Sequence, residues 1–456
     1  MLKIVLYRLA CRLAALATLL SCLFEGPTAT VSAAPVQAPN ILFILADDQR
    51  WDTIHTLGNE EIHTPNLDRL VERGFYFSNA YCMGSMTPAV CLPSRTMLLT
   101  GRSLWRLPQV AGAEPPPDLV LLPRVLHDAG YVTYHCGKAN NACRYGNAAF
   151  DFNVETAKTG PEDMERHGDQ IVKFLEEHDH ERPFFIYLAP PVPHDPRIAP
   201  AKFAAMYDAN TLSLPRNFMP AHPFNNGELR IRDEMLAAHP RTPQEMRKHL
   251  AEYYACVSDL DEQVGRIVGK LADLDYAENT IVIFSSDQGL AVGGRHGLMG
   301  KQNLYEHVKP PLVIAGTGIR RGRSEALVYL YDLFPTICEY AHAATPDVVE
   351  GKSLGPIVRG EKADLRPYLF AAYRDRQRMV RDQRWKLIEY MVSNEHHTQL
   401  FDLSKDRDEL NNLADQEDND EVLARLRAQL LQLATQFEDP DAALYRKAIA
   451  GNALAN

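Results

Sequence analysis

Four runs of hydrophobic residues, each followed by a polar cluster, predict the central strands of the fold. The runs are continuous rather than alternating, which indicates strands covered on both faces, and helical patterns separate them, as in a mostly parallel α/β sheet. They cover residues 40–46, 131–136, 183–189 and 280–286. Ligands bind beyond the carboxyl ends of such strands. We therefore expect the polar residues that follow the four runs to meet in one crevice: Asp47, Asp48, Lys138, His194, Asp287 and Gln288.

A long amphipathic helix is predicted to precede the last of these strands. Thr242 is a suitable N-cap, Pro243 suits the first turn, and Glu245 follows three residues after the cap. Apolar residues then recur at helical spacing as far as Leu271, which indicates packing only. The preceding stretch, residues 195–241, is rich in proline and has no sustained period, as is typical of a functional rim.

The sequence pattern changes in the last quarter of the chain, where short strand-like segments replace the long hydrophobic runs. Residues 378–389 and 399–403 are typical of short strands, and residues 421–437 follow a helical pattern. We therefore expect a large domain over residues 34–360 and a smaller α+β subdomain, an antiparallel sheet plus a helix, over residues 361–456.

Residues 1–33 have the three parts of a secretory signal peptide. A basic region contains Lys3, Arg8 and Arg12, an apolar run covers residues 13–24, and Val31-Ser32-Ala33 is a small-residue cleavage site. The run is too short to span a bilayer, and no later run approaches the required length. The sequence therefore predicts a secreted or periplasmic protein without a transmembrane span. An alternative is a lipoprotein cleavage box that would anchor the chain through acylated Cys22.

Composition narrows the class of partner. A hydrophobic content of 46% and a charged content of 23% are typical of a globular protein. The net charge of −11 argues against a nucleic-acid partner. It does not exclude an anionic substrate, because distant surface charge is screened beyond about 8–10 Å and a local basic pocket outweighs it.

The cysteines beyond the leader are Cys82, Cys91, Cys136, Cys143, Cys256 and Cys338. A chemical role for Cys91 would leave five, so that complete pairing is excluded. Cys136 with Cys143 is the best candidate for a disulfide, and buried free thiols are the alternative.

The acidic residues at the ends of the predicted strands favour a metal site. Asp47, Asp48, Asp287 and the amide of Gln288 offer only oxygen ligands, which calcium or magnesium prefers over zinc. One acidic pair alone is typical of a helix cap or surface turn. Two acidic clusters in one crevice favour a cation, because uncompensated carboxylates repel and raise each other's pKa.

Basic residues are predicted to converge on the same crevice. Arg95, Lys138, His194 and Lys301 lie at or near it on the strand argument. With a divalent cation they would form a socket for a compact anion, and each unit charge at ~4 Å contributes a few kcal/mol at an effective dielectric constant of ~20. Such a socket suits a phosphoryl or sulfuryl group.

Cys91 is chemically out of place in this setting. It opens a helical segment with Pro93 in its first turn, where backbone N–H groups favour negative charge. A thiolate there could act as a nucleophile, but sulfur is a poor ligand for a hard cation. The site requires an oxygen at position 91.

The surrounding motif resembles the signature of the type I, formylglycine-dependent sulfatases. Cys91-Leu92-Pro93-Ser94-Arg95, continued by Leu99-Thr100-Gly101-Arg102, carries the resemblance, which extends from Asn40 to Leu403. In that family the cysteine is oxidised to formylglycine by a formylglycine-generating enzyme, and the aldehyde hydrate supplies the missing oxygens. The resemblance implies an alkaline-phosphatase-like α/β fold with a large, mostly parallel mixed sheet.

The resemblance also implies roles for single residues. Asp47, Asp48, Asp287 and Gln288 would bind calcium, with magnesium as the less suitable ion, and formylglycine at position 91 would be a further ligand. Arg95 would neutralise the hydrate, Lys138 and Lys301 would bind sulfate, and His194 would bind sulfate and protonate the leaving alcohol. In the implied reaction one hydrate oxygen attacks sulfur as the alcohol departs, and the other hydrate oxygen then expels sulfate by breaking the C–O bond, which restores the aldehyde.

Two positions depart from the family pattern. Gln288 replaces the usual Asn or His, although its amide oxygen can still coordinate a metal. Asn140 replaces a histidine that is thought to help regenerate the aldehyde, and His135 and His296 are candidate substitutes.

The sequence therefore predicts a sulfuric ester hydrolase that acts on a sulfated carbohydrate or another small sulfate ester. Arg295 and His296 are candidate sugar-binding residues, with a surface role as the alternative. An aryl sulfate or choline sulfate would suit the same core. Alternative functions are a formylglycine-dependent phosphonate monoester or phosphodiester hydrolase and a catalytically inactive glycan-binding relative.

Overall fold

An eight-stranded mixed sheet forms the centre of the fold. The computed structural model describes residues 38–108, 115–156 and 160–453. In chain order the strands are β1 (Asn40–Ala46), β2 (Phe75–Phe77), β5 (Val132–Lys138), β6 (Phe152–Thr156), β7 (Phe184–Ala189), β8 (Thr280–Ser286), β9 (Leu312–Gly316) and β10 (Gly322–Ser324). In space their order is β10-β2-β9-β8-β1-β7-β5-β6. β1 pairs in parallel with β7 and β8, whereas β9 runs antiparallel to β8 and β2.

The four hydrophobic runs form adjacent central strands, as predicted. Every residue of β1, β5, β7 and β8 is buried. Along β1 the side chains alternate between two cores, with Ile41 and Phe43 on one face and Leu42 and Ile44 on the other. Both faces are therefore covered, which explains why the run is continuous in the sequence.

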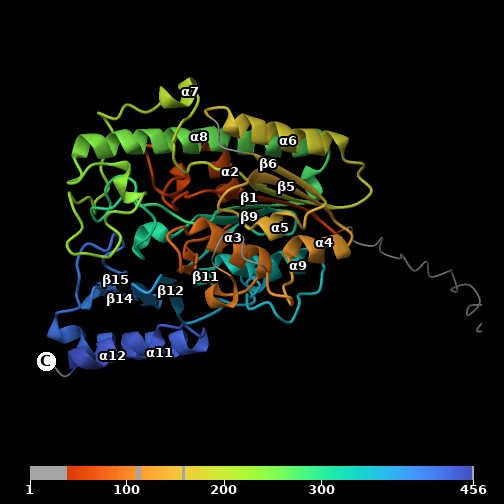
Figure 1. Ribbon diagram of the computed structural model, residues 1–456. Helices are drawn as coiled ribbons and strands as arrows, with labels where there is room; N and C mark the ends of the chain where they lie inside the picture. Colours follow the sequence, from red (N-terminus) through yellow and green to blue (C-terminus); the bar gives the residue numbers. More distant parts are fainter. Residues whose placement is uncertain (1–37, 109–114, 157–159, 454–456) are drawn as a thin grey trace, which may run out of the picture. The chain divides into compact units, whose positions relative to one another are not determined.

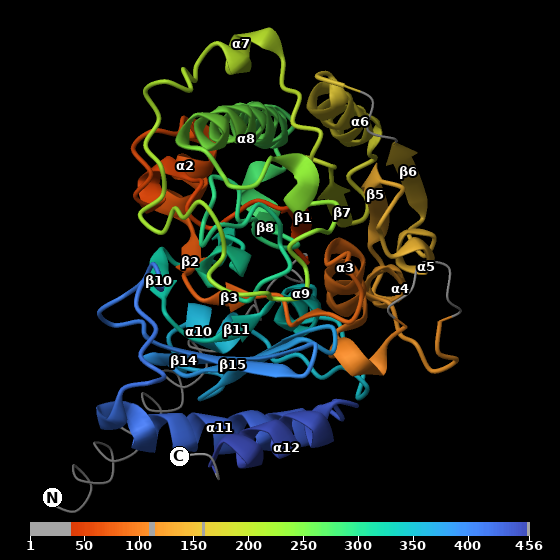
Figure 2. The same cartoon turned by 60° about the vertical axis from the view of Figure 1, so that its left-hand side comes forward.

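Helices cover both faces of this sheet (Figures 1 and 2). One face packs against α2 (Pro65–Arg73), α6 (Asp163–Glu177) and α8 (Pro243–Asp273). The other packs against α3 (Cys91–Thr100), α4 (Leu122–Asp128) and α9 (Leu333–Tyr340). Shorter helices are α5 (Arg144–Asn147), α7 (Ala201–Ala204) and α10 (Gly355–Val358).

The start of α8 follows the predicted capping pattern. Thr242 is the N-cap, and its side-chain oxygen accepts a hydrogen bond of 3.3 Å from the backbone N–H of Glu245. Pro243 occupies the first position of the helix, where its missing N–H costs nothing. The predicted helix is thereby confirmed, and it extends two residues beyond Leu271.

A second, five-stranded sheet lies beyond α3 and α9 (Figure 1). Its strands are β12 (Leu369–Tyr373), β13 (Gln377–Arg381), β14 (Trp385–Val392), β15 (Glu395–Asp402) and the short β4 (Gly84–Ser85). β12 to β15 pair antiparallel, and α11 (Asp420–Gln436) and α12 (Ala442–Ala453) cover the sheet. The predicted antiparallel sheet with helical cover near the C-terminus is confirmed, and its boundary at residue 361 stays a prediction.

The larger domain contributes a strand to this sheet. β4 pairs with β12, and a Cβ atom on Gly84 would lie 1.8 Å from the carbonyl oxygen of Ala372. Gly84 also has a φ of 109°, so that only glycine suits this crossing. Sequence periodicity had not indicated a contact between these distant segments.

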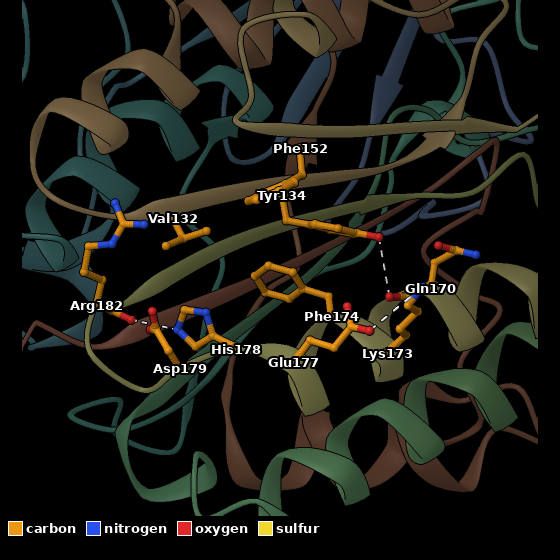
Figure 3. A pocket seen from close by; sticks show the side chains of 10 residues that line it. All are labelled: Val132, Tyr134, Phe152, Gln170, Lys173, Phe174, Glu177, His178, Asp179 and Arg182. Atoms are coloured by element: carbon orange, nitrogen blue, oxygen red, sulfur yellow. Dashed lines mark hydrogen bonds and ion pairs between the residues drawn. The ribbon is translucent and has the colours of Figure 1, made fainter.

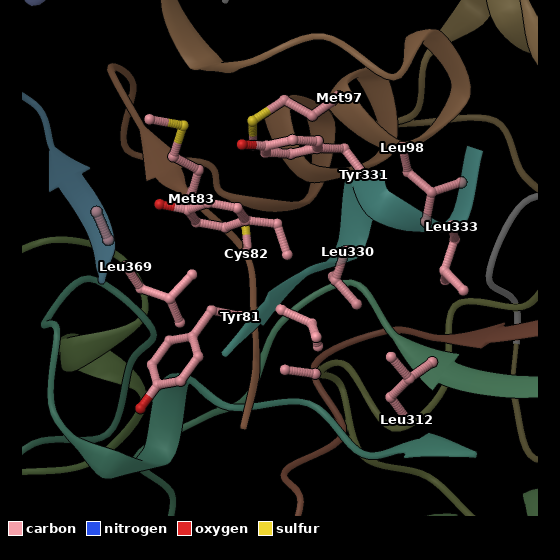
Figure 4. Packing of buried hydrophobic residues seen from close by; sticks show 14 of the residues in the cluster. Tyr81, Cys82, Met83, Met97, Leu98, Leu312, Leu330, Tyr331, Leu333 and Leu369 are labelled. Carbon is pink, nitrogen blue, oxygen red and sulfur yellow. The ribbon is translucent and has the colours of Figure 1, made fainter. Parts of the chain in front are cut away.

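One apolar core joins α3 to both sheets (Figure 4). Met97 and Leu98 of α3 face Tyr331 and Leu333, and Leu369 of β12 belongs to the same cluster. A third sheet, of two short strands, pairs β3 (Ala80–Tyr81) with β11 (Val328–Tyr329) within this core. The core fixes α3 and therefore the position of Cys91 at its first residue.

The predicted disulfide is wrong. Cys136 and Cys143 are both free and buried. Cys136 points into the core under α6 and α8, whereas Cys143 belongs to the core on the opposite face of the sheet. The sheet therefore separates two cysteines that are close in sequence.

The predicted signal peptide, residues 1–33, and the alternative lipid-anchor site at Cys22 lie outside the described residues. Among the residues that the structure describes, none of the helices combines the length and apolar character that a bilayer span requires.

Candidate functional site

The acidic residues that follow β1 and β8 meet at the carboxyl end of the sheet. The parallel register of the two strands sets Ala46 beside Ser286, so that Asp47-Asp48 and Asp287 leave the sheet together. The backbone N–H of Asp48 donates to Oδ1 of Asp287 at 3.1 Å. The predicted convergence of two clusters 239 residues apart is therefore observed.

The first turn of α3 places Cys91 and Arg95 against these acids. Sγ of Cys91 lies 3.2 Å from Oδ1 of Asp47 and 3.6 Å from Oδ1 of Asp48. Arg95, one helical turn later, donates from Nε to Oδ2 of Asp287 at 2.8 Å. Ser94 donates to the carbonyl of Asp287 at 2.6 Å, a contact that sequence reasoning missed.

Two lysines and a histidine complete the cluster. Lys138, at the end of β5, pairs with Asp47. Nζ of Lys301 lies 2.7 Å from Oδ2 of Asp48 and 3.1 Å from Sγ of Cys91. His194 follows β7 and holds Nε2 3.7 Å from Oδ2 of Asp48. Its Nδ1 donates to the carbonyl of Asp195 at 2.7 Å, which turns Nε2 toward the cluster.

The cluster balances acids against bases in a buried environment. Asp47, Asp48 and Asp287 are each no more than 1% exposed. Burial alone raises a carboxyl pKa, but Lys138, His194 and Arg95 bring the pKa of Asp47 well below its usual value. Burial raises the pKa of Asp48 to about 6 and outweighs the opposing effect of Lys301. Burial and the negative charge of Asp47 also raise the pKa of Asp287.

The same environment acts on Cys91 and His194. Burial and the charges of Asp287, Asp47 and Asp48 raise the pKa of the Cys91 thiol well above its ordinary value. A thiol that stays protonated is a poor nucleophile. Burial and the nearby Lys301 lower the pKa of His194 to about 4, so that the free site holds a neutral imidazole.

Ligand atoms of Asp47, Asp48, Cys91 and His194 all lie within 4.8 Å of one another. A metal ion could therefore be held by this group, with Asp287 adjacent through its contact with Asp48. Gln288, the other predicted ligand, donates from Nε2 to the carbonyl of Lys301 at 3.0 Å. This hydrogen bond fixes the amide beside the lysine that pairs with Asp48.

Supporting residues that the sequence had not marked hold the loop after β1. The hydroxyl of Tyr253, on α8, donates to the carbonyl of Asp48 at 2.6 Å and accepts from the N–H of Arg50 at 2.9 Å. Ser286 accepts from the N–H of Gln49 at 2.8 Å. The reading of α8 as packing only is therefore wrong. The presence of Tyr253 among the apolar positions of α8 could have indicated this contact, because a buried tyrosine hydroxyl requires a hydrogen-bond partner.

Arg295 and His296 are held by acids outside the Cys91 cluster. Arg295 lies 2.7 Å from Oε1 of Glu306 and also pairs with Asp52. Nε2 of His296 lies 3.0 Å from Oε2 of Glu306, and its ring stacks on Tyr305. Both side chains are buried. A direct contact of either residue with a sugar stays a prediction.

The structure brings neither suggested substitute for the missing family histidine to Cys91. His135 is buried in β5 with Nδ1 2.7 Å from Oδ1 of Asn153, and His296 faces Glu306. Asn140 is exposed. Within the described part of the chain, His194 is the histidine that shares the metal-sized group with Cys91.

A separate hollow lies beside β5 and α6 (Figure 3). Tyr134, Phe152 and Phe174 line it, together with Val132 at the start of β5 and Arg182 just before β7. It therefore opens toward the amino ends of these strands, whereas Lys138 stands at the carboxyl end. In an open α/β sheet the carboxyl end is the expected ligand site.

Two protein-family models match the chain. The model described as Sulfatase matches residues 39–343. A model described as N-sulphoglucosamine sulphohydrolase, C-terminal, matches residues 294–436. The first contains every residue of the Cys91 cluster, and the second includes β12 to β15 of the C-terminal sheet.

Similar proteins include several named sulfatases. An arylsulfatase of Clostridium perfringens is 26% identical, over 86% of this chain and 94% of the relative. An N-acetylglucosamine-6-O-sulfatase of Bacteroides thetaiotaomicron is 23% identical, over 88% and 87% of the two chains. A choline-sulfatase of Rhizobium meliloti is 28% identical, over 83% and 82%.

Solved structures share the fold. One, described with its substrate D-glucosamine-2-N,6-O-disulfate, superposes with a TM-score of 0.75 at 23% identity and covers 89% of this chain and 99% of its own. A phosphonate monoester hydrolase of Agrobacterium radiobacter also gives 0.75, at 20% identity and with 88% and 96% coverage. The fold is therefore alkaline-phosphatase-like, and the chain belongs to the sulfatase family of sulfuric ester hydrolases.

Proposed function

We propose that this enzyme hydrolyses sulfate esters of a sulfated carbohydrate through formylglycine at position 91 and a calcium ion. The observation that carries the proposal is the position of Cys91, buried between Asp47, Asp48 and Lys301. This environment keeps a thiol protonated, yet it surrounds position 91 with groups that suit an oxygen nucleophile. Conversion of the cysteine to an aldehyde resolves this conflict.

The residues present fit a hard divalent cation. Asp47, Asp48 and Asp287 supply carboxylate oxygens, and the amide oxygen of Gln288 is a further ligand of the type that calcium accepts. Calcium suits the set better than magnesium because it takes six to eight oxygens in flexible geometry. When bound, the ion would supply positive charge that stabilises oxygen anions at position 91 and on the sulfuryl group.

Charge balance supports entry of the cation together with an anion. The three carboxylates already face the three fixed cations of Arg95, Lys138 and Lys301. A divalent ion would leave excess positive charge in a buried site. A sulfate ester, which gains negative charge as sulfur is attacked, offsets that excess at the step where stabilisation accelerates the reaction.

The chain's own residues can bind and orient the ester. Once oxidised, residue 91 would supply the hydrate oxygen that attacks sulfur. Arg95 has a buried Nη2 with no hydrogen-bond partner, 3.8 Å from Oδ1 of Asp47, and it can donate to an oxygen at position 91. Lys138, which pairs with Asp47, and Lys301, which pairs with Asp48, would each bind a sulfate oxygen.

His194 is placed to protonate the leaving alcohol. In the free site its pKa is lowered to about 4, mainly by burial and by Lys301. A sulfate group bound by Lys301 would offset that positive charge and favour the protonated imidazole. The proton then passes from Nε2 to the departing oxygen, while Nδ1 stays bonded to the carbonyl of Asp195.

A carbohydrate is the substrate class that the relatives support. An N-acetylglucosamine-6-O-sulfatase and ulvan-active sulfatases are among the similar proteins. Choline sulfate is the alternative that the choline-sulfatase relative raises, and it would require an aromatic cage. Trp105 packs against Phe370, and Trp51 faces Lys309 and Arg407, so that both rings already have partners.

Maturation and export complete the proposal. A formylglycine-generating enzyme would act on the signature that begins at Cys91. The predicted leader over residues 1–33 would deliver the enzyme to the periplasm or the medium, where sulfated polysaccharides are accessible.

The phosphonate monoester hydrolase neighbour keeps one rival function open. Matched aryl esters of sulfate, a phosphodiester and a phosphonate should be compared on the purified enzyme. All three esters carry one negative charge, so the cations of the site do not by themselves separate them. We expect kcat/KM for the sulfate ester to exceed the other two by at least about 100-fold, because the matching family model and the named relatives are those of sulfatases. Faster turnover of the phosphorus esters would overturn the sulfatase proposal.

A panel of defined sulfated mono- and disaccharides then tests the substrate class. Sulfate release is the readout. Release from at least one sugar supports the carbohydrate proposal, whereas tight binding without release, in a preparation with converted residue 91, would indicate an inactive glycan-binding protein.

Calcium binding should depend on pH through Asp48. Its pKa of about 6, raised by burial, means that a proton competes with the metal below that pH, whereas the carboxylate is ionised above it. We expect the calcium Kd to rise about tenfold per pH unit below pH 6 and to be constant above about pH 7. Calorimetric titrations between about pH 4.5 and 8 measure this, and a flat profile would contradict it.

A further inference from the structure

A second charged cavity lies apart from the Cys91 cluster. Its volume is about 280 Å³, and its lining comes from β10, at the edge of the large sheet, and from the C-terminal sheet. Residues of the proposed catalytic cluster do not line it. Its lining includes Tyr81, Lys309, Arg323, Arg381, Arg407 and Glu409.

The acids around this cavity are already neutralised. Glu306 pairs with Arg295 and His296, as described above. Glu409 lies 2.9 Å from Nζ of Lys386, and Glu325 lies 2.8 Å from Arg323. The group of His296, Glu306 and Glu409 has the spacing of a metal site, but Arg295 and Lys386 already supply the positive charge that a metal would bring.

Three cations remain without an acidic partner. Within the described residues, no carboxylate lies within 4 Å of Lys309, Arg381 or Arg407. Arg381 is only 3% exposed and donates to the hydroxyl of Tyr81 at 2.9 Å and to Oδ1 of Asn79 at 3.2 Å. These neutral acceptors satisfy hydrogen bonds but do not cancel charge. We refer to Lys309, Arg381 and Arg407 as the basic triad.

The electrostatics of neighbouring groups agree with excess positive charge. Burial lowers the pKa of Lys309, and Arg381 and Arg407 lower it further, against the opposing effects of Tyr81 and Glu409. Burial by itself would raise the pKa of Tyr81, but Arg381, Lys309 and Lys386 bring it below its ordinary value. Unpaired cations in a concave, partly desolvated site are costly, and a bound anion would offset that cost.

An aromatic ring extends the cavity into a second hollow. Nζ of Lys309 lies 4.5 Å from the ring centre of Trp51, and the guanidinium carbon of Arg407 lies 5.6 Å from it. A hollow of about 410 Å³ beside Trp51 shares Ser404 and Arg407 with the first cavity. Lys405 and Asp406 also line it, as do Arg216 and Asp408, which pair with each other at 3.1 Å, so that Arg407 remains the excess positive charge of this hollow. The Trp51 ring therefore holds Lys309 and Arg407 in place, and their positive charge together with the hydroxyl of Ser404 suits the anionic groups of a sugar chain.

We propose that the basic triad and the Trp51 hollow form a non-catalytic binding site for a sulfated segment of a glycan chain. In a protein of net charge −11, this locally basic site would hold one part of a polyanion while the Cys91 centre acts on another or on a separate chain. The charge argument stands by itself, whereas the choice of a glycan as the anion's carrier rests on the proposed function.

Binding of a heparin tetrasaccharide tests this site. We compare the double variant Lys309→Met/Arg407→Met with a control, Lys248→Met/Lys362→Met, which removes equal charge from exposed lysines elsewhere. Calorimetry in a Cys91→Ala background avoids turnover. We expect the Lys309/Arg407 variant to bind at least about tenfold more weakly, the control to match the parent, and added salt to weaken binding.

Two further ligands, a desulfated tetrasaccharide and inorganic sulfate, distinguish a sulfated glycan from a free anion as the occupant of the site. The desulfated tetrasaccharide should not bind, and inorganic sulfate should bind more weakly than the sulfated tetrasaccharide. If the double substitution abolishes binding of inorganic sulfate but leaves that of the tetrasaccharide unchanged, the site holds a free ion and the glycan proposal is overturned. Equal tetrasaccharide affinities in all variants would overturn the site altogether.

Kinetics on a small aryl sulfate, with Cys91 intact, separate this proposal from the proposed function. The Lys309/Arg407 substitutions should leave kcat/KM on that ester within about twofold of the parent, because neither residue touches the Cys91 cluster. Absence of turnover in every preparation would count against the proposed function. Normal turnover combined with unaltered tetrasaccharide binding would count against the second site alone.

Discussion

Replacing Cys91 by alanine should reduce kcat/KM for sulfate ester hydrolysis at least about 10⁴-fold. Alanine cannot be converted to the aldehyde, so that no oxygen nucleophile forms between Asp47, Asp48 and Lys301. The neighbouring lysines and the metal ligands would remain, and substrate should still bind. Sulfate release measured by ion chromatography, together with substrate affinity measured by calorimetry, separates lost chemistry from lost binding.

Cys338→Ala is the matched control for this substitution. Cys338 is also a buried free cysteine, but it lies in α9 within the apolar core. Its replacement should cost stability without loss of kcat. Mass spectrometry of residue 91 provides the decisive comparison, because a fully active enzyme with an unaltered Cys91 thiol would refute the assigned nucleophile.

Asp48→Asn should weaken calcium binding by at least about 100-fold and lower kcat/KM by a larger factor. The amide keeps the shape of the side chain but removes one negative charge from the proposed metal site. It also leaves Lys301 without the carboxylate that lies 2.7 Å from its Nζ. Metal content by mass spectrometry and calcium titration of the variant measure the first effect, and kinetics at saturating calcium measure the second.

The control for Asp48→Asn is Asp259→Asn. Asp259 is likewise a buried aspartate, and burial together with Glu262 raises its pKa to about 7. It lies on α8, apart from the Cys91 cluster, so that calcium content and kcat/KM should stay at the parent's values. An Asp48→Asn enzyme with unchanged metal content and activity would remove Asp48 from the proposed ligand set.

Local sequence patterns predicted the central strands and α8 because the residue types in each segment follow from its burial and from its helix ends. The run at residues 40–46 is apolar throughout because both faces of β1 are covered. Thr242 and Glu245 mark the start of α8 because a helix leaves its first N–H groups without internal partners. Asp47 and Asp287 could be placed together because the carboxyl ends of neighbouring parallel strands share one edge of a sheet.

Patterns along the chain could not assign roles that depend on contacts between distant segments. Tyr253 occupies an apolar position of α8, and only the fold shows its hydroxyl under the carbonyl of Asp48. Cys136 and Cys143 are neighbours in sequence, yet the sheet lies between them. Arg295 and His296 follow the last central strand as closely as a site residue would, but Glu306 holds both of them.

The sequence by itself determined the α/β class, the convergence of acids and bases at one sheet edge, and the chemical anomaly of a cysteine among hard ligands. Each of these follows from residue type and period, which the chain carries locally. Only the tertiary structure decided which charges are paired and which are left over, including the basic triad. Pairing is a matter of a few ångströms between side chains on different elements, and such distances are set by packing, not by order along the chain.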